Sequence, residues 1–344
     1  MQWLSSLWRD KGVQVTAVNA EQLQMVLPEA GTVLLHIRSS RELACCILCN
    51  SAEMGERLQL SVTECLGEFA DEMAWPDGSW DIVWEGQAPR SPAQLHVLRV
   101  LGNRAISPLM RRVRLQGEDL RTFAQAGIHV RMLLPNRHGE LGHEPAWPTL
   151  LNDGRLQWQT GQPRMARRTY TIRALDVENG WMDVDVLLHN NPGGAPPGSA
   201  WAEQALPGSC VGVLSPGSGL MPSAAHYIMV ADACALPAAA RMLETSAFEQ
   251  PPALLLWVAN DAERSAFDVS PTLALPTWIC SGEPGASPAE TDQIMAWLDQ
   301  QNWQTPDTTL WLAGGLPLTQ AARRWATAKP ELAGVRKLIH TYWR

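Results

Sequence analysis

Three patterns of hydrophobic and polar positions follow one another along the chain. Residues 1 to about 92 are the least regular: residues 32–37 predict a short strand, and residues 41–58 a helix with Leu43, Ile47 and Leu48 on its apolar face. The middle of the chain, to Pro222, consists of short stretches with alternating character, which is typical of strands. From His226 onward, continuous apolar runs alternate with stretches of helical period, which indicates a parallel sheet covered on both faces.

Separate elements can be predicted in the last two parts. The middle part predicts strands over 95–101, 110–115, 128–134, 168–174, 181–188 and 210–214, and many short strands between turn residues favour a barrel or sandwich. The last part predicts strands over 227–230, 254–258, 277–280, 309–312 and 337–341, and helices over 236–243, 289–298 and 318–326. We expect a multidomain α+β and α/β protein with an N-terminal α+β domain (1–92), an antiparallel β-barrel (93–222) and a parallel-sheet α/β nucleotide-binding domain (223–344).

Composition excludes several classes of protein. Of 344 residues, 46% are hydrophobic, which is too many for a disordered chain. No apolar run approaches the roughly 20 residues of a membrane helix, and the N-terminus has no signal-peptide pattern. The 27 basic and 35 acidic residues leave a net charge of −8, which argues against nucleic acid as a partner. An odd number of cysteines, seven, favours reduced thiols and a cytoplasmic location.

The strand over residues 167–173 carries the strongest chemical signal. It reads Arg-Arg-Thr-Tyr-Thr-Ile-Arg, and alternation places Thr171 and Arg173 on one face, with Tyr170 and Ile172 on the other. Arginine presents a forked cation that suits phosphate, and tyrosine a planar surface for stacking. The alternative is a solvated strand whose tyrosine lies in the core and whose arginines pair with surface acids.

A second candidate follows the strand that ends at His189. Residues 197–202 read Pro-Gly-Ser-Ala-Trp-Ala, and Ser199 is a candidate first residue of a helix. Exposed amides at a helix start bind anions. The alternative is an ordinary loop with a capping serine.

These segments resemble the siderophore-interacting protein family of NAD(P)H-dependent ferric-siderophore reductases, in the ferredoxin-reductase-like superfamily. Residues 168–173 resemble its R-x-Y-T-x-R flavin signature, and Val186-Leu-Leu-His189 with residues 197–202 resemble its V-L-H-G…G-P-A-S-x-W-A stretch. Five more segments resemble family motifs in the same order: 106–115, 129–135, 231–238, 311–314 and 342–344. The resemblance covers roughly residues 95–344.

The resemblance implies an FAD site in which the flavin carries the chemistry, so no side chain is expected to be catalytic and no resident metal is expected. Arg168 would neutralise the flavin phosphates, Tyr170 would stack on the isoalloxazine, and Thr171 would hydrogen-bond near N5. The implied cofactor contacts are Arg168, Thr169, Tyr170, Thr171, Arg173, Leu188, His189, Pro197, Gly198, Ser199, Ala200, Trp201, Asp232 and Trp343.

The implied reaction passes a hydride from NADPH or NADH to FAD, and then single electrons to the Fe(III) of a ferric siderophore in the cytoplasm. Because such a chelate carries negative charge, a locally positive cleft would attract it despite the acidic balance. The candidate substrate contacts are Arg131, Arg111, Arg112 and Arg164, with solvated strand ends as the alternative.

Three positions depart from the family pattern. Asn190 follows His189 where a glycine is usual, Ala233-Cys234 replace an acidic residue and a threonine, and Gly315 stands where the family has glutamate. These departures motivate a second hypothesis, a non-catalytic siderophore- or partner-binding protein on the same fold.

A third hypothesis is an iron–sulfur-containing reductase. Cys45, Cys46, Cys49 and Cys65 supply the four thiols of a cluster. On the predicted helix, however, Cys45 and Cys49 fall beside apolar residues, which favours cysteines that pack as small hydrophobes. The His138–Glu144 segment contains further metal-ligand types, but its spacing matches no standard site.

Overall fold

The computed structural model describes residues 14–27, 31–73, 79–85, 94–125, 127–135, 145–151, 154–159, 163–189, 194–218, 224–246, 248–282 and 288–343, with the single residues Gln2, Leu4, Ser5, Trp8, Trp75 and Gly161. It divides into two compact units, residues 1–94 with 146–162, and residues 95–145 with 163–344. The sequence pattern does not predict that residues 146–162 join the first unit. The domain limits expected at 92/93 and 222/223 stay predictions.

The first unit is an α+β structure. A four-stranded antiparallel sheet in the order β1-β2-β3-β4 packs on helix α2, and its core includes Leu23 and Val33 from the sheet and Leu58 and Val62 from the helix. Its elements are β1 (Gln14–Ala17), β2 (Gln22–Leu27), β3 (Gly31–Ser39), β4 (Glu42–Cys49) and α2 (Ala52–Glu72), with the pair β8 (Thr149–Leu150) and β9 (Leu156–Gln157).

The helix predicted over residues 41–58 is wrong in its first half. Residues 42–49 form strand β4, which pairs with β3, and the helix begins only at Ala52. The Ser51 hydroxyl accepts the backbone N–H of Met54 at 3.2 Å, which is a helix-start interaction. Pairing with β3 therefore outweighed the apparent helical spacing of Leu43 and Ile47, because the strand places alternate residues, Cys45 and Ile47, on the core of this unit.

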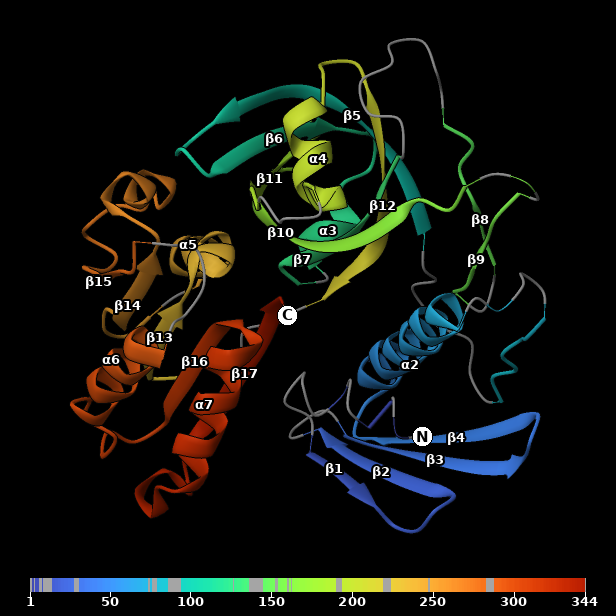
Figure 1. The fold of residues 1–344 in the computed structure, drawn as a ribbon, viewed down its shortest axis with the longest axis horizontal. Coiled ribbons are helices and arrows are strands. Elements are labelled where there is room, and N and C mark those ends of the chain that lie inside the picture. Colours follow the sequence, from blue (N-terminus) through green and yellow to red (C-terminus); the bar gives the residue numbers. More distant parts are fainter. Residues whose placement is uncertain are drawn as a thin grey trace. The chain divides into compact units, whose positions relative to one another are not determined.

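The second unit begins with a closed barrel of six strands in the order β10-β11-β6-β5-β12-β7 (Figure 1). Its interior is filled by alternate residues of the strands and by Trp201 and Ala202 of helix α4. The elements are β5 (Gln94–Ala105), β6 (Met110–Gln116), α3 (Arg121–Gln125), β7 (His129–Leu134), β10 (Ala166–Asp176), β11 (Trp181–Leu187), α4 (Pro197–Gln204) and β12 (Cys210–Ser218).

The chain then forms a parallel five-stranded sheet in the order β15-β14-β13-β16-β17 (Figure 1). One face packs on α5 and the other on α6 and α7, so strand residues alternate between two cores. The elements are β13 (His226–Ala231), the 3-10 helix η1 (Ala233–Ala235), α5 (Leu236–Thr245), β14 (Ala253–Val258), η2 (Asp261–Ala266), β15 (Thr277–Cys280), α6 (Pro288–Asp299), β16 (Thr308–Gly315), α7 (Leu316–Thr327), η3 (Pro330–Leu332) and β17 (Arg336–Trp343).

The predicted barrel and α/β elements are therefore confirmed. The strands alternate apolar and polar residues with period 2 or run apolar throughout, and the structure buries those residues as the pattern requires. In the described part of the chain, no helix has both the length and the apolar character that crossing a membrane requires.

Candidate functional site

Strand β10 presents its side chains to two different surroundings, as alternation predicts. Tyr170 and Ile172 pack on the barrel core. Thr171 and Arg173 are buried on the opposite face, where Thr171 lies 3.2 Å from His129 and Arg173 pairs with Glu244 of α5. The strand thus links the barrel interior to the α/β domain within four residues.

Tyr170 lies directly against the start of helix α4. A Cβ on Gly198 would overlap the Tyr170 hydroxyl, so only glycine allows this close approach. Pro196 precedes the helix and supplies no side-chain cap. The first amides of α4 therefore lie beside a phenol, and both are groups that donate hydrogen bonds to an anion.

Ser199 is buried and joins α4 to the end of β11. Its hydroxyl oxygen accepts the backbone N–H of His189 at 2.8 Å, and it lies 3.5 Å from the Leu187 carbonyl. The helix begins at Pro197, two residues before the predicted start. Ser199 therefore positions the helix rather than capping it.

Asp232 organises the carboxyl edge of the parallel sheet. Its buried carboxylate accepts hydrogen bonds from Trp343 Nε1 at 2.7 Å, from the Gly315 amide at 2.9 Å and from the Ala235 amide at 3.1 Å. Burial raises the pKa of Asp232 to about 6, although these hydrogen bonds oppose the rise. Because ligands of such sheets bind where the strands end, Asp232 lies where a nucleotide would approach.

His189 connects this edge to the barrel. Its Nε2 lies 3.7 Å from the Cys234 sulfur, and its ring lies 6.3 Å from the Trp343 ring. Burial lowers the pKa of His189 and raises that of Cys234 well above its usual value. Both groups are therefore neutral near pH 7, so the pair has no thiolate nucleophile.

His129 contacts Thr171 on the face of β10 opposite Tyr170. Its Nδ1 lies 3.2 Å from Thr171 Oγ1 and its Nε2 lies 2.9 Å from the Tyr342 hydroxyl. Burial, with the nearby charges of His340 and Arg241, lowers the pKa of His129 to about 3. His129 and Tyr342 lie in segments that resemble family motifs, but the motifs by themselves do not assign either residue to the site.

The remaining predicted cofactor contacts are spread more widely. Arg168 and Thr169 are exposed on β10, and Arg168 Nη1 donates to the Arg167 carbonyl. Trp201 is 2% exposed in the barrel core, and Leu188 packs against that core. Pro197 is exposed and Ala200 is half-buried on α4.

The four predicted substrate arginines do not converge. Arg111 lies on β6 and donates to Asn103, whereas Arg131 lies on β7 opposite Thr169; two strands separate β6 from β7 either way round the barrel. Arg164 precedes β10. Arg112, also predicted to contact substrate, is buried and forms ion pairs with Asp185 and Asp268.

The iron–sulfur hypothesis is not supported by the cysteine positions. Cys45 packs on the core of the first unit and Cys46 is exposed on the other face of β4, so their thiols diverge. Among the residues that the structure describes, no three metal-ligating side chains form a group that would hold a metal. The predicted departure at Asn190 and the His138–Glu144 segment lie outside the described residues.

The residues around Tyr170 and the start of α4 suit FAD. The first amides of α4 have no side-chain cap and would suit a pyrophosphate, and the Tyr170 ring adjoins them at Gly198. Arg168, exposed on the same strand as Tyr170, is a cation of the kind that suits phosphate. This donor set on a barrel, followed by a nucleotide-type parallel sheet, defines a class of two-domain flavoproteins.

Comparison with known proteins identifies the family within this class. Residues 99–220 match the model of the siderophore-interacting FAD-binding domain, and residues 224–344 match that of the siderophore-interacting protein. The chain belongs to the siderophore-interacting protein family.

Similar proteins include a siderophore utilization protein from T. fusca, 30% identical with a TM-score of 0.59 over 74% of this chain and 94% of that one. The siderophore-interacting protein SipS from Aeromonas hydrophila is 25% identical with a TM-score of 0.55, over 74% and 92%. Ferric vibriobactin reductase ViuB of Vibrio cholerae serotype O1 is 32% identical over 143 residues, 40% of this chain. The match spans about half (49%) of that relative's length.

Proposed function

We propose that this chain is an FAD-dependent, NAD(P)H-oxidising ferric-siderophore reductase. One observation carries the proposal: a chain of contacts through His189 and Cys234 links Tyr170 of β10 and the start of α4 to Asp232 and Trp343 of the parallel sheet. Bound FAD supplies the chemistry, because it takes a hydride from a nicotinamide and releases electrons one at a time.

The barrel side would hold the flavin. Arg168 and the first amides of α4 would bind the pyrophosphate, and Gly198 allows Tyr170 to lie close to the start of that helix. His129, held neutral, lies 3.2 Å from the Thr171 hydroxyl and would orient it if Thr171 contacts the flavin. These groups bind and orient the cofactor, and none of them reacts covalently.

The α/β side would hold NADPH or NADH. The carboxyl ends of β13 and β16 lie side by side, and Asp232 binds the amide of Gly315 across them. Trp343, held by the same carboxylate, supplies a flat apolar surface against which a ring can stack.

The iron is the substrate. Reduction of Fe(III) to Fe(II) weakens its complex with hard oxygen chelators and frees the metal. Arg131, opposite Thr169 on the neighbouring strand, is the cation that we expect to contact an anionic chelate. No disulfide joins any of the seven cysteines, all of which lie in the described residues, and this agrees with a reaction in the cytoplasm.

An absorption spectrum tests the proposal. The purified protein should bind FAD and be yellow, the flavin band should bleach with NADPH or NADH, and ferric siderophore should restore it as Fe(II) appears. A protein that binds no FAD would overturn the proposal. Binding of siderophore without nicotinamide-dependent reduction would favour the non-catalytic binding protein instead.

A further inference from the structure

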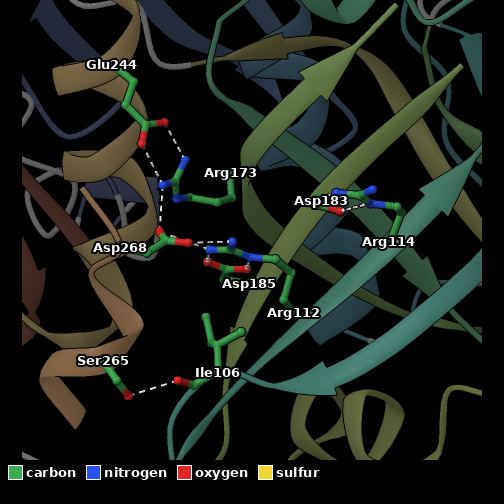
Figure 2. A network of polar contacts seen from close by, with 9 residues as sticks. All are labelled: Ile106, Arg112, Arg114, Arg173, Asp183, Asp185, Glu244, Ser265 and Asp268. Atoms are coloured by element: carbon green, nitrogen blue, oxygen red, sulfur yellow. Dashed lines mark hydrogen bonds and ion pairs between the residues drawn. The ribbon is translucent and has the colours of Figure 1, made fainter. Parts of the chain in front are cut away.

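A buried network of ion pairs joins the barrel to the α/β domain (Figure 2). Arg112 of β6 binds Asp185 of β11 within the barrel through two hydrogen bonds of 2.7 and 2.8 Å. The same guanidinium also donates to Asp268, in the segment after η2 of the α/β domain, at 2.8 Å. One barrel arginine is therefore shared between a barrel carboxylate and a carboxylate of the next domain.

Asp268 also binds a second barrel arginine. Arg173 of β10 donates to Asp268 at 2.7 Å and to both oxygens of Glu244 on α5, at 2.6 and 2.8 Å. The side chains of Arg112 and Arg173 are 9% and 5% exposed, whereas Asp268 is 45% exposed. Asp268 thus reaches from the surface to two buried cations that belong to different strands.

Electrostatics hold Asp268 ionised in this place. Burial alone would raise its pKa, but the hydrogen bonds and charges of Arg112 and Arg173 hold the pKa at about 2. If Asp268 is neutralised, Arg112 keeps Asp185 and Arg173 keeps Glu244, so the change removes the link from Asp268 to both arginines without leaving either cation unpaired. Forked arginine–carboxylate pairs also fix direction as well as distance, so the network restricts how the two domains can rotate.

A second contact fixes the turn between β5 and β6 to the α/β domain. Glu263 of η2 is 2% exposed and accepts hydrogen bonds from the Ser107 hydroxyl at 2.6 Å and from the Leu109 amide at 3.1 Å. Ser265 donates to the Ile106 carbonyl at 2.9 Å (Figure 2). The segment of residues 261–268 therefore holds the barrel at two places.

A third contact lies beside the candidate flavin residues. Arg241 of α5 donates to the carbonyl of Ile172 at 2.6 Å, where the pairing of β10 with β11 shifts register. Ile172 directly follows Thr171, and Arg173 follows Ile172. Helix α5 starts just after Asp232 and ends at Thr245. One helix therefore links the nucleotide edge to the strand that would carry the flavin.

We propose that these contacts form a joint that sets the angle between the flavin strand and the nucleotide edge, and that Asp268 is its central positioning residue. Only the expected effect of the joint on hydride transfer to the flavin rests on the proposed function. Asp268 contacts Arg112 and Arg173 and would act through these two arginines.

The test compares two neutralised carboxylates in the full-length protein. Asp268→Asn weakens the joint, whereas Asp183→Asn breaks the forked pair of Arg114 and Asp183, at 2.8 Å, which lies entirely within the barrel (Figure 2). Each variant is measured for FAD affinity, for the rate of flavin reduction by NADPH, and for hydrogen exchange of the backbone without cofactor.

Asp268→Asn should slow flavin reduction about 10- to 100-fold, because a misplacement of about 1 Å costs this much in rate. Its FAD affinity should stay within about threefold of wild type, since Asp268 bonds to none of the proposed pyrophosphate contacts, Arg168 and the first amides of α4. Amides of residues 105–110 and 172–175 should exchange about tenfold faster, as expected for local opening. Asp183→Asn should show neither the rate change nor faster exchange in these two segments.

Equal rates and equal exchange patterns in the two variants would overturn the proposal. If Asp268→Asn does not fold, Ser107→Ala decides, because it removes a single neutral donor to Glu263: reduction should slow about threefold, with faster exchange at residues 105–110. A wild-type protein that binds no FAD would refute the proposed function, while the exchange comparison would still test the joint.

Discussion

The indole of Trp343 lies on Gly315 so closely that a Cβ at position 315 would come within 2.5 Å of a ring carbon. The Trp343 Nε1 and the Gly315 amide donate to the same oxygen of Asp232, at 2.7 and 2.9 Å. The resemblance to the family predicts a glutamate at this position, and any side chain there would meet the indole. Without a side chain at position 315, the indole takes that space.

Gly315→Ala should therefore destabilise the protein. The new methyl group forces the indole away and weakens its hydrogen bond to Asp232, at a cost of about 1–3 kcal/mol. Urea unfolding measures the loss. Gly102→Ala on β5 is the matched control, because nothing lies within 4 Å of a Cβ there; equal stability of the two variants would contradict this packing.

Gly198→Ala should destabilise the protein and weaken FAD binding, since its methyl group would overlap the Tyr170 hydroxyl. Adding Tyr170→Phe removes that oxygen and leaves the nearest ring carbon at 3.3 Å. The double variant should recover part of the stability, with a coupling of about 1 kcal/mol or more in a double-mutant cycle. Additive effects of the two changes would mean that the residues are not in contact.

Arg168→Ala tests the phosphate contact. Since Arg168 is exposed, its loss should leave unfolding unchanged, while loss of charge-assisted hydrogen bonds of about 1.5–3 kcal/mol lowers FAD affinity roughly 10- to 100-fold. Fluorescence titration with FAD gives the affinity. Arg104→Ala, an exposed arginine on β5, is the control and should bind FAD as wild type does; an equal loss there would point to nonspecific charge.

His129 should make the protein less stable in acid. Its pKa falls from 6.5 to about 3 on folding, so its contribution is fully present above pH 6.5 and is lost as the pH falls toward 3. Between pH 7 and 5 this costs about 2 kcal/mol. His129→Gln should flatten that part of the pH profile of unfolding.

Tyr342→Phe is the control variant for His129→Gln. It removes the hydrogen bond to Nε2 without removing a group that titrates in this range. It should lower the free energy of unfolding by about 1 kcal/mol at every pH, with the slope unchanged. A His129→Gln profile as steep as that of wild type would show that other groups cause the acid sensitivity.

The sequence by itself determined the elements of the barrel and of the α/β domain. Period-2 strands such as residues 110–115 and apolar runs such as 254–258 have one stable arrangement, in which their apolar faces are buried. The motif on β10 also indicated the face that carries Thr171. The sequence pattern wrongly predicted a helix where strand β4 lies. Leu43 and Ile47 fit a helical spacing, and only pairing with β3 makes them part of a sheet.

Tertiary structure alone decided which charges meet. Arg112 and Arg173 lie in arginine-rich segments, and the sequence predicts that they bind substrate and cofactor. In the structure they pair instead with Asp268 and Glu244, about 70 to 160 positions away along the chain. A hint existed in Asp185, a carboxylate within an apolar strand, since a buried charge requires a partner. Local sequence specifies backbone and burial through short-range sterics and periodicity, whereas ion pairing depends on distances that exist only after the two domains pack.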